Sequence, residues 1–244
     1  MRVISPSYKR AGSVEVRKWL PDTILAVPEF EADEYRDREG GAIVALPDSA
    51  RGNMAKVRNA IIDLAEPDEW FVQLDDDVTE VGYFGAVTGE ANHVVYTADQ
   101  FYEFVEMGSM MADELGTAMW GVNVTFDPRF YREYSPLSLQ SPVLGTMCVM
   151  KPVSGIRYDE RLSLNEDYDI FLSYLARFRK VLRFDRNYYV ADHLTSPGGC
   201  GSYRDLATEQ DQAVIMQRKW GKDIVTFNFA RTTNPRLHSP IPGM

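Results

Sequence analysis

The stretch that decides the fold is Trp70-Phe71-Val72-Gln73-Leu74, followed directly by Asp75-Asp76-Asp77. A short apolar run of this kind is typical of a buried strand. Three adjacent carboxylates repel one another, and at the end of a buried strand that repulsion is costly unless a cation neutralises it. Carboxylate oxygens are hard ligands that favour Mg²⁺ or Mn²⁺. The stretch therefore predicts a divalent-metal site that binds phosphate oxygens, with a solvated acidic turn as the alternative.

The three aspartates are not expected to be equivalent. Alternate residues of an extended chain point the same way, so Asp75 and Asp77 would face one site and Asp76 another. Asp75 and Asp77 are therefore candidate ligands of one metal site, and Asp76 would face a different one.

The pattern around this stretch indicates an α/β fold with one sheet wrapped by helices. Short apolar runs alternate with helical periodicity, and ligands of such open sheets bind at the carboxyl ends of the strands. Asn53 is expected to cap a helix, and Asp99 another that Gly116 ends. Strands are predicted at 2–5, 24–27, 43–46, 70–74, 118–124, 143–150, 181–184 and 188–190, and further helices at 13–20, 166–177 and 205–220.

The 244 residues, with 45% apolar and 25% charged content, suit one domain. We predict a donor half up to about residue 120, an acceptor half over 121–227 and a C-terminal arm over 228–244. Neither an apolar signal segment nor a membrane span is apparent, and Cys148 and Cys200 suggest free thiols. A soluble cytoplasmic protein without membrane contact is expected.

The net charge of −10 argues against a surface that binds nucleic acid non-specifically through counterion release. Local clusters of Lys and Arg can still make a basic groove. Such clusters occur at residues 9–10, 177–186 and 218–219.

A second group of carboxylates lies in Asn165-Glu166-Asp167-Tyr168-Asp169, at the start of the helix predicted over 166–177. Acidic residues are favoured in a first helical turn, so simple capping is one interpretation. The functional interpretation is that one carboxylate acts as a general base on an acceptor hydroxyl.

His193 follows the last apolar strand of the predicted core and precedes the Gly-rich segment 195–203. A histidine in such a place can simply pack at the surface. As a third ligand, its imidazole would complete a metal site with the aspartates. The segment after it could close over a ligand as a lid.

Polar residues near the first two strands are candidates for donor binding. Lys9 and Arg10 could meet phosphates, and Arg58 lies on the helix before the aspartate strand. Glu29 follows the second strand, where a carboxylate could accept the N3–H of a uracil ring. Surface charges of these types also need no special explanation.

Taken in order, these motifs resemble a GT-A nucleotide-sugar glycosyltransferase of the family 2 kind, from residue 2 to residue 193. Asp75-Asp76-Asp77 is similar to the Asp-x-Asp motif. The other matches are Val3–Arg10 to the opening strand and turn, Lys56–Ala60 to an Ala-Arg-Asn helix, Gly145–Val149 to the strand near the acceptor, and Tyr158-Asp159-Glu160 with Glu166-Asp167 to a Phe-Asp-Glu…Glu-Asp block.

More narrowly, the chain resembles the TET-associated glycosyltransferases of bacteriophages. The compact domain, the Ser5–Arg10 start and the Val27–Glu31 segment carry this resemblance. It implies transfer of a sugar from a UDP-sugar to 5-hydroxymethylcytosine, or a related hydroxymethylpyrimidine, in phage DNA. The expected location is then the host cytoplasm.

The resemblance also implies roles for individual residues. Asp167 would be the base of an inverting transfer, with Glu166 or Asp169 as substitutes. For the acceptor, Trp120 could stack on a base and Arg204 could contact a phosphate, although core packing and solvated charge are the plain alternatives. The metal, Mn²⁺ or Mg²⁺, would be held by Asp77, Asp75 and His193, and the donor by Ser5, Lys9, Arg10, Glu29, Arg58, Asp75 and Asp76.

Three other functions stay open at this level. The acceptor could be a polysaccharide, a lipid or a protein. A sugar-phosphate nucleotidyltransferase shares the architecture but usually has a Gly-rich loop after the first strand, where this chain has Pro6–Gly12. A non-catalytic binding module is disfavoured by the joint presence of the aspartates, the Glu-Asp pair and the histidine.

Overall fold

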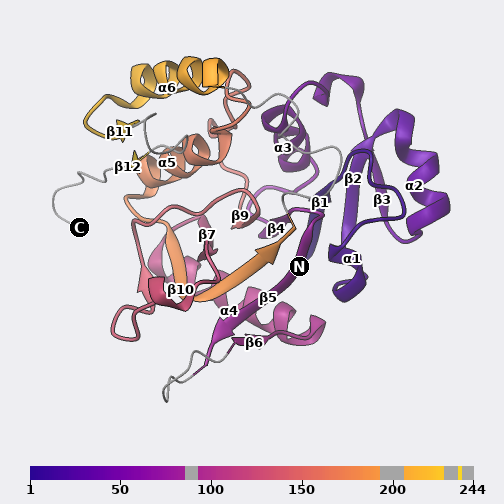
Figure 1. Ribbon diagram of the computed structural model, residues 1–244, viewed down its shortest axis with the longest axis horizontal. Helices are drawn as coiled ribbons and strands as arrows, with labels where there is room; N and C mark the ends of the chain where they lie inside the picture. The colour runs from indigo at the N-terminus through magenta and orange to yellow at the C-terminus, as the bar shows by residue number, and fades with distance from the viewer. Residues whose placement is uncertain (86–92, 193–205, 228–235, 238–244) are drawn as a thin grey trace.

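The computed structural model of the chain describes residues 1–85, 93–192, 206–227 and 236–237 (Figure 1). Within these ranges, ten strands form one sheet and two short strands form a separate pair. The sheet strands are β1 (Arg2–Pro6), β2 (Ile24–Pro28), β3 (Ile43–Leu46), β4 (Phe71–Leu74), β5 (Val78–Phe84), β6 (His93–Val95), β7 (Met119–Asn123), β8 (Leu137–Ser138), β9 (Met147–Met150) and β10 (Leu182–Ala191). The separate pair is β11 (Val225–Thr226) with β12 (Arg236–Leu237).

The helices of the same ranges differ greatly in length. The α-helices are α1 (Val16–Trp19), α2 (Ala32–Glu39), α3 (Met54–Ile62), α4 (Ala98–Leu115), α5 (Glu166–Phe178) and α6 (Leu206–Trp220). Short 3₁₀ turns occur at Glu29–Glu31, Asp48–Ala50 and Pro128–Phe130. None of these helices combines the length and apolar content that crossing a membrane requires.

The sheet is mixed, with strand order β3-β2-β1-β4-β9-β7-β10-β5-β6. The first four strands in this order pair in parallel. β9 runs antiparallel to both β4 and β7, so β4 and β7 point the same way. β10 is parallel to β7, and β5 and β8 pair with β10 in antiparallel fashion. The predicted α/β class, with one mixed sheet flanked by helices, is confirmed.

Two apolar layers cover the sheet, because alternate strand residues point to opposite faces. Val3 and Val72 pack in one layer, while Ile4 and Phe71 pack in the other. Residues of α1, α2 and α4 complete the first layer, and residues of α3, α5 and α6 complete the second. Helices therefore flank both faces of the sheet, and they leave the ends of the strands uncovered by these two layers (Figure 1).

The sequence predictions hold best for the first half of the sheet. The predicted cap at Asn53 is confirmed, since its side chain accepts a hydrogen bond from the Lys56 N–H at 3.0 Å. The cap of α4 is Thr97 and not Asp99, because Thr97 makes a reciprocal capping box with Gln100. The strands predicted at 181–184 and 188–190 are one strand, β10, whose register shifts between Phe184 and Tyr188.

Several elements were not predicted. The acidic segment after β2 contains the helix α2, whose exposed face is strongly charged. β5 and β6 form an antiparallel edge beside β10.

The predicted boundary near residue 120 falls inside β7, so the same sheet contains strands from both predicted halves. Apart from β12, the predicted arm over 228–244 lies outside the described residues, as does Cys200, while Cys148 is a buried free thiol.

Trp120 lies in the core, and the predicted contact between its ring and an acceptor is withdrawn. Its side chain is fully buried, and its indole N–H donates to Ser109 Oγ at 3.1 Å. Phe104 and Phe184 pack edge-on against the ring at centroid distances of 5.4 Å each. Gly108 of α4 admits the indole, since a Cβ there would lie 2.7 Å from it.

This packing predicts that Gly108→Ala destabilises the fold. Overpacking a rigid core costs about 1–3 kcal/mol, whereas alanine gains only about 1 kcal/mol over glycine inside a helix. Urea unfolding is therefore expected at a lower midpoint in this variant. Met110→Ala is the matched control on the same helix, because Met110 is 70% exposed. A Gly108→Ala protein as stable as the control would contradict the packing described.

Candidate active site

The three aspartates form a tight turn and do not continue the strand. β4 ends at Leu74, and the Val78 N–H returns to the Asp75 carbonyl at 3.3 Å. The Asp75 N–H donates to the Thr146 carbonyl at 2.9 Å, which fixes the turn against the segment before β9. The alternation predicted for an extended chain is therefore wrong: Asp76 and Asp77 both face Arg10, whereas Asp75 faces Arg58.

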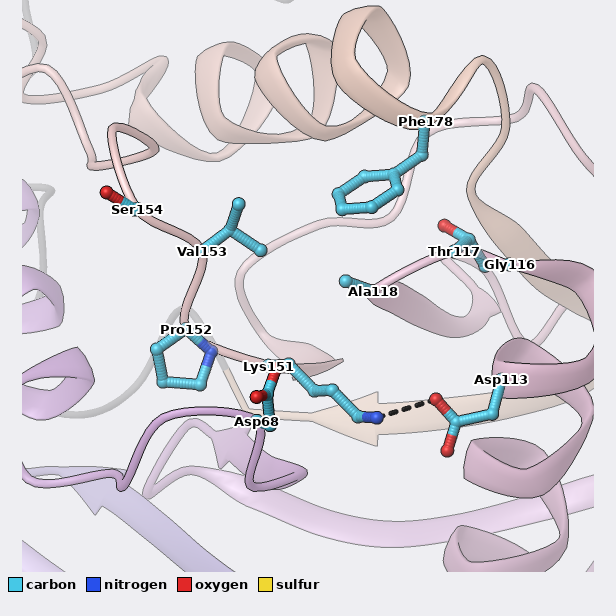
Figure 2. Close-up of a pocket in the computed structure, with 10 residues that line it drawn as sticks. All are labelled: Asp68, Asp113, Gly116, Thr117, Ala118, Lys151, Pro152, Val153, Ser154 and Phe178. Carbon is cyan, nitrogen blue, oxygen red and sulfur yellow. Dashed lines mark hydrogen bonds and ion pairs between the residues drawn. The ribbon is translucent and has the colours of Figure 1, made fainter.

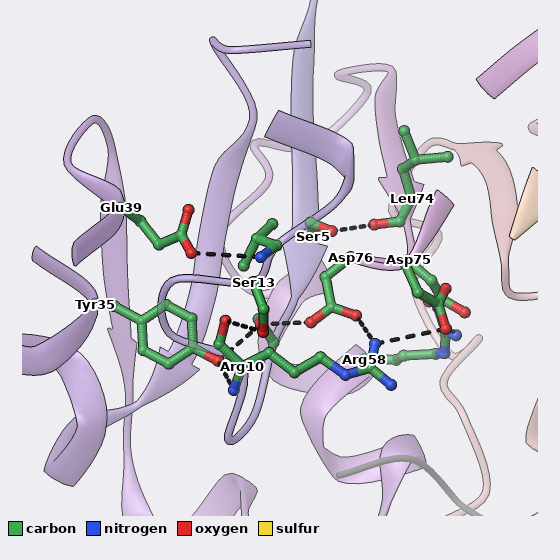
Figure 3. A network of polar contacts seen from close by, with 12 residues as sticks. Ser5, Arg10, Ser13, Tyr35, Glu39, Arg58, Leu74, Asp75 and Asp76 are labelled. Atoms are coloured by element: carbon green, nitrogen blue, oxygen red, sulfur yellow. Dashed lines mark hydrogen bonds and ion pairs between the residues drawn. The ribbon is translucent and has the colours of Figure 1, made fainter. Parts of the chain in front are cut away.

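Asp76 is held by the turn that follows β1 (Figure 3). One carboxylate oxygen accepts from Arg10, and the other accepts from the Ser7 hydroxyl at 2.5 Å. The Asp76 carbonyl accepts the N–H groups of Glu15 and Val16 at 2.9 and 3.1 Å. Burial raises the pKa of Asp76 to about 7, while Arg10 and Ser7 oppose that shift. These bonds fasten the aspartate turn to the start of α1.

Asp77 shares the Arg10 guanidinium, at 3.5 Å from its Oδ2 to Arg10 Nη1. Its carbonyl accepts the Asp192 N–H at 3.0 Å, which joins the aspartate turn to the end of β10. Burial alone would lower the pKa of Arg10, but Asp76 and Asp77 outweigh it and raise that pKa. Arg10 thus stays charged between two carboxylates.

Arg58 is the cation on the other side of the turn. Its side chain is 3% exposed, and it donates to Asp75 Oδ1 at 2.9 Å and to the Gly145 carbonyl at 2.8 Å. Its Nε lies 3.7 Å from Glu166 Oε1. Burial would lower the pKa of Arg58, but the neighbouring Asp75 and Glu166 help to raise it well above its usual value. One guanidinium therefore connects the aspartate turn to the start of α5.

Glu166 and Asp167 open α5 with different surroundings. Glu166 is buried, and burial raises its pKa to about 8, with Asp167 adding to the shift and Arg58 opposing it. Asp167 is half-buried and accepts the Tyr168 N–H at 2.8 Å. Burial also raises the pKa of Asp167, while Arg58 and the N–H groups of Tyr168 and Gly145 oppose that. Of the two, Asp167 is the more exposed carboxylate.

Asp169 is not available as a substitute base. It is fully buried, and its two oxygens accept from Lys219 Nζ and from the Trp220 indole N–H, each at 2.7 Å. Lys219 and Trp220 end α6, which lies beside α5 in Figure 1. This corrects the sequence prediction, because the Asp169 carboxylate docks one helix on the other.

Asn59 and Tyr189 are two further site residues that the analysis of single residues missed. Asn59 follows Arg58 on α3, donates to the Tyr158 carbonyl at 3.0 Å and accepts the Tyr158 N–H at 2.9 Å. It thereby positions the segment leading to Glu166. The Tyr189 hydroxyl is hydrogen-bonded to Thr146, and burial together with nearby carboxylates raises its pKa. The Arg-Asn pair quoted above signalled Asn59, whereas nothing in the apolar pattern of β10 signalled Tyr189.

The remaining donor candidates lie at the ends of β1 and β2. Ser5 is fully buried and donates to the Leu74 carbonyl, so it joins β1 to β4 and is not placed to contact a donor. Lys9 and Glu29 are both exposed. The buried carboxylate of this region is Glu31, which accepts the Lys9 N–H at 2.9 Å. The remaining predicted site residues, His193, Arg204 and the lid over 195–203, lie outside the described residues.

The described residues contain no cluster of three or more side chains that could hold a metal ion. Mg²⁺, however, is commonly held by one or two carboxylates together with substrate phosphates and water. Asp75 and Asp77 supply carboxylate oxygens of this kind at the turn. Asp77 pairs with Arg10 and Asp75 with Arg58, and their joint role as metal ligands stays a prediction.

A cavity of about 400 Å³ opens at the opposite edge of the sheet (Figure 2). Its walls include residues just before β4 and β7 and just after β9, such as Asp68, Thr117 and Lys151. The Lys151 ammonium pairs with Asp113 at 2.6 Å beside it. The cavity therefore lies at the amino ends of β4 and β7, away from the aspartate turn.

The aspartate turn and the start of α5 thus lie around the buried Arg10 and Arg58 at the carboxyl edge of the sheet. The model of the TET-Associated Glycosyltransferase family matches residues 1–199, and the chain belongs to this family. It is therefore a glycosyltransferase.

Among solved structures, the chain is similar to the crystal structure of S. aureus TarS 1-349. The identity is 14% and the TM-score is 0.45, over 91% of this chain and 73% of that chain. No curated protein matches the sequence significantly.

The placement of Asp169 predicts a loss of stability without a loss of chemistry in Asp169→Asn. Hydrogen bonds to charged groups contribute about 1.5–3 kcal/mol each, so the free energy of unfolding, measured with urea, should fall by an amount in that range. Sugar transfer by the folded variant should stay near that of the unchanged protein. A variant of normal stability that had lost transfer would return Asp169 to the catalytic site.

Proposed function

We propose that the chain is a metal-dependent, inverting transferase that moves a sugar from a UDP-sugar to a hydroxyl group in DNA. The suggested acceptor is 5-hydroxymethylcytosine or a related hydroxymethylpyrimidine. Membership of the TET-associated family supports this proposal. The observation that carries it is the Arg58 guanidinium, which joins the aspartate turn to the start of α5, where Asp167 is reachable from solvent.

Asp167 is the proposed general base. It removes the proton of the acceptor hydroxyl as that oxygen bonds to the anomeric carbon, and the bond from that carbon to the diphosphate breaks, with its electron pair leaving on UDP. General bases contribute about 10²–10⁴-fold to such steps. Burial raises the pKa of both carboxyl groups, and in the proposed mechanism Glu166 holds a proton while Asp167 acts as the ionised member of the pair.

The donor is proposed to lie at the carboxyl ends of β1, β2 and β4. The exposed Lys9 ammonium contacts the phosphates, and the exposed Glu29 reads the uracil ring. Arg10 orients the Asp77 carboxylate. When bound, Mn²⁺ or Mg²⁺ on Asp77 supplies Lewis-acid stabilisation of the departing diphosphate.

The acceptor base must leave the DNA stack to bring its hydroxymethyl group to Asp167. Enzymes that modify bases extrude them from the duplex or act on single strands, at a cost of a few kcal/mol. A polysaccharide, a lipid or a protein as acceptor remains the alternative, and the acceptor assay distinguishes these cases.

The decisive assay incubates the protein with Mn²⁺, radiolabelled UDP-sugars and DNA with or without 5-hydroxymethylcytosine. Label is expected only in the modified DNA. Label in neither DNA would overturn the proposal that hydroxymethylated DNA is the acceptor. Label in added polysaccharide, lipid or protein would support the alternative acceptors.

The same assay tests the base with Asp167→Asn. Transfer should fall by about 10²–10⁴-fold, while binding of UDP, followed by calorimetry, stays intact. Because burial raises the pKa of Asp167, the rate should fall as the pH drops through a value above the usual aspartate range of about 3.9. Asp169→Asn is the matched control, since that carboxylate serves α6. Full transfer by Asp167→Asn would assign the base elsewhere.

The metal ligand is tested by thermal shift with UDP and Mn²⁺. A ligand that binds only the native state raises its apparent stability, so the unchanged protein should melt at a higher temperature with both present. Asp77→Ala should lose the part of the shift that depends on Mn²⁺, and Asp75→Asn should keep it. A Mn²⁺-dependent shift that persists in Asp77→Ala would remove Asp77 from the metal site.

A further inference from the structure

The segment after β7 exposes large aromatic side chains at unusual density. Phe126, Phe130 and Tyr134 are 53%, 70% and 86% exposed, all within nine residues. Singly exposed apolar residues are ordinary on protein surfaces, whereas three large exposed rings in one short segment suggest an interaction site. We refer to residues 126–134 as the aromatic segment.

The aromatic segment rests on a packed base. Tyr131 stacks on Phe84 at a centroid distance of 5.4 Å and an angle of 22°. His93 contacts Phe84 at 5.4 Å, and Phe126 packs edge-on against His93 at 6.4 Å. These contacts hold the backbone of the segment while the outer rings face solvent, so little ordering entropy is lost when a partner binds.

Cations alternate with the exposed rings. The Arg129 side chain is 84% exposed and pairs with Asp127, and Arg132 donates to the carbonyls of Arg129 and Tyr131. Arg186 of β10 lies over the Tyr83 ring at 5.1 Å. Asp127 and Glu133 balance Arg129 and Arg132 within the aromatic segment, so the segment itself is neutral in a chain of net charge −10.

The aromatic segment leaves the same edge of the sheet as the aspartate turn, because β7 and β4 are both antiparallel to β9. The chain then passes through β8 and returns at Gly145, whose carbonyl accepts from Arg58. One continuous stretch, the loop beside β10 in Figure 1, therefore runs from the exposed rings to the proposed base.

We propose that the aromatic segment is the acceptor-binding surface, on which the unstacked bases of a DNA strand lie while the target base enters the site. This inference rests on the proposed function, from which it takes DNA as the acceptor. Phe130 and Tyr134 stack on bases, and Arg129 contacts a phosphate. Aromatic side chains bind single strands in this way with little regard to sequence, because every base has a π-face.

The test measures two properties of Phe130→Ala and Tyr134→Ala, with Met110→Ala, 70% exposed on α4, as control. The first is binding of a fluorescent single-stranded oligonucleotide by anisotropy, and the second is KM for hydroxymethylated DNA. Stacking contributes about 1–3 kcal/mol per base, which corresponds to a roughly 5- to 150-fold weaker Kd and higher KM. Unfolding midpoints and UDP-sugar hydrolysis without acceptor should not change.

Arg129→Gln tests the phosphate contact separately. Its DNA affinity should fall for all sequences, and the slope of log Kd against log salt should decrease by about 0.7, the value for one phosphate of a single strand. Asp127→Asn is the matched control, since it removes the partner of Arg129 and keeps the cation.

The outcomes separate this inference from the proposed function. Weakened DNA binding in the aromatic variants, with no transfer by the unchanged protein, would support the surface and overturn the acceptor chemistry. Transfer to DNA with an unchanged KM and Kd in both variants would overturn the surface and leave the function. The DNA-binding surface would also be overturned if the protein without substitutions binds no DNA, or if the variants lose only polysaccharide binding.

Discussion

The site depends on one buried cation, the guanidinium of Arg58. A charge taken out of water costs several kcal/mol unless partners with good geometry surround it. Arg58 meets Asp75, the Gly145 carbonyl and Gln73 within hydrogen-bond distance, and Glu166 lies just beyond. These partners come from three parts of the chain, so the cation places β4 with its turn, the segment before β9 and α5 in a fixed relation. A Cβ on Gly145 would lie 2.7 Å from the guanidinium, which explains a glycine there.

A second arginine divides the charge of the aspartate turn. Three adjacent carboxylates would repel one another, and the tight turn separates them so that Arg58 faces Asp75 while Arg10 faces Asp76 and Asp77. The two arginines offset part of the repulsion within the protein itself. Each of the three aspartates therefore lies beside a guanidinium, and Asp75 is the most exposed of the three side chains.

The sequence was informative where local patterns decide the structure. The strands up to β4, the Asn53 cap and the start of α5 follow from apolar runs and capping residues. The aspartate turn was mispredicted because a bond from Val78 to Asp75, and not propensity, ends the extended conformation. Trp120 was misassigned because an aromatic residue in an apolar run looks the same whether a ligand or Gly108 faces it. The different surroundings of Asp167 and Asp169 could have been predicted from the sequence. Residues two apart on a helix point about 200° away from each other.

The acidic balance of the chain also has a place in this picture. A net charge of −10 repels a polyanion at long range, so counterion release cannot dominate binding of DNA. Stacking on exposed rings acts only at contact and requires bases that are already out of the helix. An acidic enzyme that relies on Phe130 and Tyr134 would therefore discriminate against intact duplex, whose bases are covered, and favour strands that are open or locally distorted. In the proposed mechanism, the same residues would also help to unstack the target base, so that its hydroxymethyl group can reach Asp167.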